Sequence, residues 1–158
     1  RQRLAENGSG TGFAVCDVCA DADMVWEAVK DFDGYAERIK TVRTVTPYVS
    51  EAQGSEGEPC YSFLVSRIRL VLNVRFTIDE TRRRVAWQLD QQSWVLSDSM
   101  GYWLVEPLAD RPGLVRVWFC VTVRLARLVP GFVVGLVSRL GLKKATSWVA
   151  DLGSRSTD

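Results

Sequence analysis

Few side chains in this sequence are suited to acid–base or metal chemistry, because its 158 residues include no histidine. This absence removes Ser–His–Asp and Cys–His nucleophile systems, histidine-ligated zinc and haem, and the commonest general base. Any catalysis would have to use carboxylate, tyrosine, lysine, arginine or cysteine side chains. We therefore assign no catalytic residue and favour a protein that is not an enzyme.

The four cysteines are the next candidates, and two of them have the C-x-x-C spacing of metal and redox sites. Cys16 and Cys19 lie in the segment FAVCDVCA, which alternates between apolar and polar residues as a strand does. Residues three apart on a strand point to opposite faces, so these thiols cannot grip one metal ion. No second pair is formed by Cys60 and Cys120. We predict structural thiols, with no metal site and no cofactor.

Charge and hydropathy argue against two further classes. Lysine and arginine total 20 against 19 acidic residues, a net charge of +1, whereas nucleic-acid modules usually carry a clear basic excess. No stretch reaches the roughly 18 consecutive apolar residues of a membrane span, so any membrane contact is expected to be peripheral. Because the sequence begins at Arg1 rather than Met, we expect an intracellular protein whose targeting segment has been removed, with plastid or mitochondrion as the organellar alternatives.

The elements that would position a site begin with a strand and two helices. Thr11 to Ala20 alternates as a strand, and Asp21 or Asp23 can cap the helix that follows. Asp33-Gly34 ends this helix, and YAERI predicts a short second one.

Strand patterns then continue from Lys40 to Leu125. The alternating run from Cys60 to Glu80 would extend about 65 Å if straight, so we expect a turn near Ser66 to Arg69. The last strand, Leu114 to Leu125, has one continuous apolar face. Consecutive strands joined by short turns predict an antiparallel meander with one face to cover.

A long amphipathic helix from Leu128 to Gly153 is the element best suited to cover that face. Pro130 suits its first turn, and Phe132, Leu136 and Leu140 form one apolar stripe. We predict an α+β fold in which a curved antiparallel sheet of about six to seven strands wraps this helix. Two short helices follow the first strand. One domain is expected over residues 11–153, after a flexible lead-in at 1–10 and before a tail at 154–158.

Four stretches together carry a family resemblance. They are Val25-Trp26 with Asp31, Tyr35 and Ile39; the segment RRRVAWQL; Gly101-x-Trp103-x-x-Glu106-Pro107-Leu108; and the closing VPGFVVGLVSRLGLKKATSWV. In order and spacing they resemble the START-like, or helix-grip, superfamily, and within it the polyketide cyclase/dehydrase and coenzyme Q-binding group. The resemblance implies an apolar cavity between sheet and helix, in a group that spans lipid carriers, quinone-binding proteins, aromatic cyclases and ligand-free regulators. It supplies no universal catalytic motif.

The candidate cavity consists of residues expected on the inner faces of the sheet and the helix. The alternative is that the same residues pack into a solid core. The candidates are Tyr35, Trp87, Leu89, Trp103, Val105, Val117, Phe119, Phe132, Leu136 and Leu140.

Arginine and tryptophan on the opposite face define a second candidate surface. A solvated outer face is the preferred interpretation, and docking on an anionic lipid or a protein is the alternative. The residues are Arg67, Arg69, Arg75, Trp94, Arg116 and Trp118.

Three functional hypotheses follow. The first is a binding or carrier protein for a hydrophobic small molecule such as a lipid, quinone, isoprenoid or pigment. The second is an accessory subunit of a larger, membrane-associated complex, with no ligand. The third is an aromatic polyketide cyclase or dehydratase, which the lack of histidine disfavours.

Overall fold

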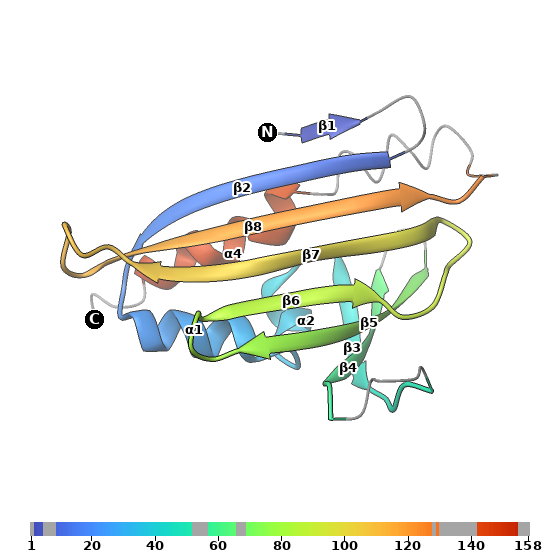
Figure 1. The fold of residues 1–158 in the computed structure, drawn as a ribbon, viewed down its shortest axis with the longest axis horizontal. Coiled ribbons are helices and arrows are strands. Elements are labelled where there is room, and N and C mark those ends of the chain that lie inside the picture. The colour runs from blue at the N-terminus through green and yellow to red at the C-terminus, as the bar shows by residue number, and fades with distance from the viewer. Residues whose placement is uncertain are drawn as a thin grey trace.

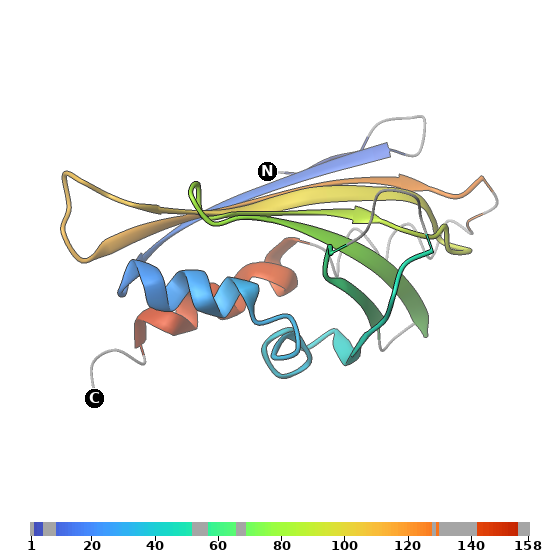
Figure 2. The ribbon, with the colours of Figure 1, turned by 60° about the horizontal axis from the view of Figure 1, so that its bottom comes forward.

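The computed structural model describes residues 2–4, 9–51, 57–65, 69–127, 129 and 142–154. In these residues an eight-stranded sheet has the order β1-β2-β8-β7-β6-β5-β4-β3, and every neighbouring pair is antiparallel (Figure 1). Figure 2 shows the sheet arching over the helices, which lie on its inner face. The elements are β1 (Gln2–Leu4), β2 (Ser9–Cys19), α1 (Ala22–Lys30), α2 (Tyr35–Arg38), β3 (Val42–Pro47), β4 (Cys60–Val65), β5 (Leu70–Asp79), β6 (Arg84–Leu89), β7 (Leu96–Pro107), β8 (Leu114–Leu125) and α4 (Leu142–Ser154).

The predicted α+β architecture is confirmed, and β1 accounts for the strand beyond the six to seven expected. Gln2–Leu4 pair with Gly10–Gly12 of β2, and β2 begins at Ser9. The prediction of a flexible lead-in over residues 1–10 was therefore wrong for these positions. Glycine-rich sequence gave no strand signal, whereas an unpaired edge of β2 offers free backbone groups to a neighbouring segment.

Helix α1 begins at a side-chain cap. The Asp21 carboxylate accepts hydrogen bonds from the backbone amides of Asp23 (2.9 Å) and Met24 (3.0 Å), which have no partner within the helix. Of the two aspartates predicted as caps, Asp21 has this role, while Asp23 binds the Arg83 guanidinium on the turn after β5. The apolar face of the helix is buried against the sheet through Val25, Trp26 and Val29.

The long alternating run turns where its length required a turn. Strand β4 ends at Val65 and β5 begins at Leu70, and the two are antiparallel neighbours. Arg69, immediately before β5, has a φ of 48°. This left-handed conformation is uncommon for a residue other than glycine. Because an arginine adopts it here, the sequence contained no glycine to mark the turn.

The structure describes a C-terminal helix over part of the range in which one was predicted. Helix α4 covers Leu142–Ser154, with Trp148 and Val149 buried, whereas Phe132, Leu136 and Leu140 lie outside the described residues. No helix in the described part of the chain has the length and apolar composition needed to cross a membrane.

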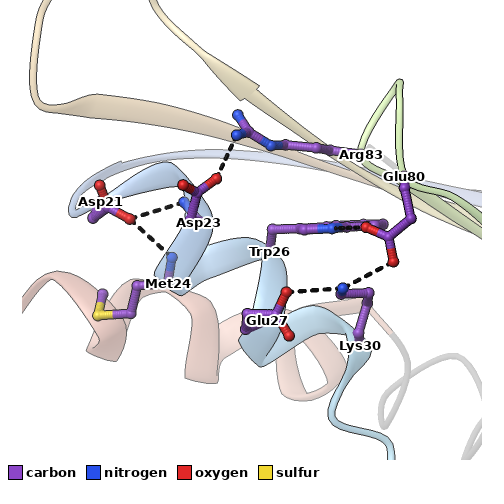
Figure 3. A network of polar contacts seen from close by, with 8 residues as sticks. All are labelled: Asp21, Asp23, Met24, Trp26, Glu27, Lys30, Glu80 and Arg83. Atoms are coloured by element: carbon purple, nitrogen blue, oxygen red, sulfur yellow. Dashed lines mark hydrogen bonds and ion pairs between the residues drawn. The ribbon is translucent and has the colours of Figure 1, made fainter.

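Glu80, on the β5–β6 turn, links α1 to the sheet through polar contacts (Figure 3). Its carboxylate accepts hydrogen bonds from the indole of Trp26 (2.7 Å) and the ammonium of Lys30 (2.9 Å), and Lys30 also pairs with Glu27 (2.8 Å). The hydrogen bonds from Lys30 and then Trp26 hold the pKa of Glu80 below its usual 4.5. The contacts with Glu27 and then Glu80 raise the pKa of Lys30.

We predict that Glu80→Gln makes stability less sensitive to acid. A carboxylate whose pKa is lowered by folding contributes stability that is complete above its unfolded pKa of about 4.5 and is lost as pH falls through its folded pKa. Thermal unfolding measured from pH 6 downwards, at roughly half-unit steps, should therefore show a shallower loss in the variant. Glu37→Gln, at an exposed glutamate of α2, should keep the wild-type slope. Identical slopes for wild type and Glu80→Gln would contradict the proposed contribution of this contact.

Candidate functional site

An apolar pocket of about 150 Å³ lies on the inner face of the sheet, beside α2. Six of its eight lining residues are aromatic. Four had been predicted to line a cavity, namely Tyr35, Trp87, Trp103 and Phe119; the other four are Ile39, Phe63, Val74 and Phe76.

Strand register brings these rings together. Phe76 of β5 lies opposite Trp87 of β6, and Trp103 of β7 lies opposite Phe119 of β8. Directly opposed residues share one face of an antiparallel sheet, so both pairs project inwards. Trp87 and Phe119 then stack across the intervening strand, with ring centroids 5.3 Å apart, and Trp103 lies 4.4 Å from Phe119.

Gly101 provides the space that Trp87 occupies. It is the cross-strand partner of Trp87, between that residue and Val121. A Cβ atom at Gly101 would lie 2.3 Å from Cζ2 of the Trp87 indole and 2.2 Å from the carbonyl oxygen of Cys120. Only glycine therefore allows the indole to lie across β7 in this position. The family motif contained Gly101, but its part in forming the pocket wall depends on register and was not predicted.

Tyr35 is the one ionisable side chain among the described lining residues, and its hydroxyl is already bonded. It donates to the backbone carbonyl oxygen of Val29 at 2.6 Å. Burial raises the pKa of Tyr35 far above its usual value, so the hydroxyl stays protonated. Tyr35 thus contributes its ring to the pocket wall and leaves no described acid or base in the lining.

A second pocket, of about 240 Å³, adjoins the first between β2, β8 and α4. Trp103 and Phe119 line both pockets and so form the wall between them. The remaining lining residues, mostly small or apolar, are Ala14, Val15, Cys16, Val117, Thr146, Ser147, Val149 and Ala150.

Trp148 of α4 packs against Trp103 and Tyr35. Its ring centroid lies 5.8 Å from that of Trp103 and 5.9 Å from that of Tyr35, and the Arg38 guanidinium lies 5.5 Å from it. The Trp148 indole N–H is buried and has no hydrogen-bond partner among the residues that the structure describes. Such an orphaned donor carries a desolvation penalty of about 1–3 kcal/mol.

The other residues predicted to line the cavity lie outside the first pocket, and Phe132, Leu136 and Leu140 are not among the described residues. Leu89 belongs to a separate small apolar cluster with Leu70, Val95 and Leu96, and Val105 is buried in the main core without lining either pocket. Val117 lines the second pocket rather than the first.

Cys16 and Cys19 point to opposite sides of β2, as their strand position predicted. Cys16 lines the second pocket, where burial raises the pKa of its thiol, and Cys19 is exposed. Among the described residues no group of three or more cysteine and acidic side chains is placed to hold a metal ion.

Three of the six predicted docking residues, Arg75, Arg116 and Trp118, contact polar neighbours through their side chains. Arg116 makes two hydrogen bonds of 2.7 Å to Asp17, which lower the pKa of that carboxyl. The Trp118 indole donates to Glu106. The Trp118 ring also lies 5.6 Å from that of Phe13.

Trp94, another predicted docking residue, is 57% exposed. Arg75 pairs with Glu58 at 3.2 Å, Arg69 lies exposed in the turn before β5, and Arg67 lies outside the described residues.

Comparison with solved structures identifies the architecture. A START superfamily protein from Mycobacterium smegmatis superimposes with a TM-score of 0.71 at 15% identity, over 93% of this chain and 99% of the other. The Zhui aromatase/cyclase from a Streptomyces species gives 0.72 at 16% identity, over 94% and 96%. The di-domain ARO/CYC BexL gives 0.63 at 16% identity, over 92% of this chain and 46% of that one.

No family model matches the sequence, and no curated protein matches it either. At these identities the structural likeness establishes the fold alone. The protein thus has the START-like, helix-grip fold, as the sequence motifs indicated. Its likeness extends to solved START superfamily proteins and polyketide aromatase/cyclases.

We predict that Gly101→Ala displaces Trp87 and destabilises the protein by about 1–3 kcal/mol, as overpacking a buried site usually does. Near-ultraviolet circular dichroism should report the altered indole environment, and chemical denaturation should report the loss of stability. Gly153→Ala is the matched control, because a Cβ there would meet its nearest atom, Cγ1 of Val18, at 3.2 Å. An unchanged aromatic spectrum in Gly101→Ala would show that Gly101 does not determine the position of Trp87.

Proposed function

We propose that this protein binds and carries an uncharged, apolar small molecule in the aromatic pocket between the sheet and the helices. The observation that carries the proposal is the lining itself, which combines six aromatic and two aliphatic residues and whose one ionisable group, the Tyr35 hydroxyl, is already hydrogen-bonded. Lipids, quinones, isoprenoids and pigments are the ligand classes that suit such a surface.

The physical basis is the unfavourable hydration of the pocket. An ordered water needs two to four polar partners, and a lining made of aromatic and aliphatic side chains offers few of them. An apolar guest would fill the space at 150 Å³ and gain dispersion contacts with ring faces that water cannot replace. The adjoining pocket of about 240 Å³ offers room for a longer guest on the other side of Trp103 and Phe119.

A cyclase is the second candidate, favoured by the likeness to a solved aromatase/cyclase. Cyclisation of a polyketide needs a group that moves protons or stabilises an enolate. In the described lining the only ionisable group is Tyr35, whose hydroxyl donates a hydrogen bond to the carbonyl oxygen of Val29. This arrangement supports binding over catalysis. An accessory role in a larger complex stays a prediction, as do the organellar locations.

We predict that filling the pocket abolishes binding of a small apolar probe. Val74 lines the pocket and Val71 lies on the same strand, 48% exposed on the opposite face. Saturation-transfer NMR with benzene should give a signal with wild type and Val71→Phe, and none with Val74→Phe. Ile39→Phe, at another pocket-lining position, is a second filling variant if Val74→Phe does not fold. Equal benzene signals from folded filling variants and wild type would refute the pocket assignment.

We also predict that the protein isolated from its own source carries a natural apolar ligand. Mass spectrometry of an organic extract should find one compound in near-stoichiometric amount with wild type. The same extraction should find it with Val71→Phe and lose it with Val74→Phe. Absence of any such compound from the wild-type protein would count against a carrier role.

A further inference from the structure

A concave surface lies on the outer face of the sheet, away from the helices. It is a groove of about 560 Å³, within the range of small-molecule sites, which is about 300–1,000 Å³. Two neighbouring rows of cross-strand partners run across it. One row is Thr77, Ala86, Tyr102 and Cys120, and the other is Arg75, Gln88, Met100 and Thr122.

The groove exists because small residues occur between larger ones in this register. Ala86 and Cys120 contribute only small side chains to the lining. Tyr102 and Met100, from β7, supply apolar surface beside them, and Met100 is a large apolar side chain that is 44% exposed. The result is a lining that is part apolar and part polar, unlike the aromatic lining of the inner pocket.

The lining of the groove includes two arginines, Arg75 and Arg84, and one carboxylate. Its carboxylate, Glu58, is already engaged by Arg75 at 3.2 Å and by the Thr77 hydroxyl at 2.7 Å. Arg84 lies with its guanidinium 4.7 Å from the centroid of the Tyr102 ring. Among the described residues no carboxylate pairs with Arg84. Its cross-strand partner Asp79 pairs instead with Arg82 at 3.9 Å. The cation–π contact therefore holds a guanidinium without a described ion-pair partner at the edge of a partly apolar groove.

We propose that this groove binds a small organic anion, a carboxylate attached to a flat apolar body. The guanidinium of Arg84 would donate two parallel hydrogen bonds to the carboxylate, the arrangement to which its planar fork is suited. The apolar body would lie over Ala86 against Tyr102 and Met100. Gln88 adds an amide donor in the same groove.

This site is separate from the apolar pocket and does not rest on it. The groove residues Tyr102 and Cys120 alternate along their strands with Trp103 and Phe119, which face inwards, so the two sites lie on opposite faces of the sheet. Trp87 lines both, next to Gly101. Failure of either site to bind its probe would leave the other proposal intact.

The test uses 2-naphthoate and its neutral methyl ester as probes, with dissociation constants from titration calorimetry and site mapping from amide NMR shifts. Arg84→Gln should weaken naphthoate binding roughly tenfold, the usual scale for a lost charge-assisted hydrogen bond, and leave ester binding unchanged. Arg82→Gln, which removes an exposed arginine of the adjacent turn, should have no effect. Ala86→Phe should weaken both probes by filling the groove, and naphthoate should shift the amides of Tyr102 and Cys120.

Several results would overturn the proposal. Naphthoate binding that is absent, that is equal in wild type and Arg84→Gln, or that is lost in Val74→Phe but not in Ala86→Phe would exclude the groove as an anion site. Binding to phosphatidylserine vesicles without binding to soluble naphthoate would instead indicate a membrane surface.

Discussion

The packing of Trp103 is the contact on which the rest of the structure depends. This side chain is 3% exposed and lies between the sheet and α4, 4.4 Å from Phe119 on one side and 5.8 Å from Trp148 on the other, measured between ring centroids. Aromatic residues bury large areas but keep rigid, flat shapes. They hold the two layers apart without filling every space between them, and both inner pockets adjoin this residue.

The two faces of the sheet carry chemically different surfaces. Gly101 lets the Trp87 indole lie flat against the inner face, because no Cβ atom opposes it. On the outer face, the small side chains of Ala86 and Cys120 contribute to a groove. The inner surface is apolar and aromatic, whereas the outer one carries the unpaired guanidinium of Arg84 over Tyr102. The difference between the apolar inner surface and the charged outer surface follows from the alternation of side chains along each strand and from the size of a few residues.

Alternation in the sequence was sufficient to predict the fold and the inward direction of Trp87, Trp103 and Phe119, because a period of two fixes the face of each residue. It did not give position along a strand, which is why Leu89 was predicted for the cavity but lies in a separate cluster. Phe63 was missed because its place beside the pocket depends on pairing between distant strands. The outer groove could not be predicted either, since its concavity arises from small residues brought together by register.

The central claim is that the aromatic layer lines a site for an apolar guest. A crystal structure of the protein exposed to benzene tests this most directly. We expect electron density for the probe among Trp87, Trp103 and Phe119, with the rings in the positions described here. A pocket closed by movement of these rings, with benzene absent or bound only on the outer face, would contradict the account.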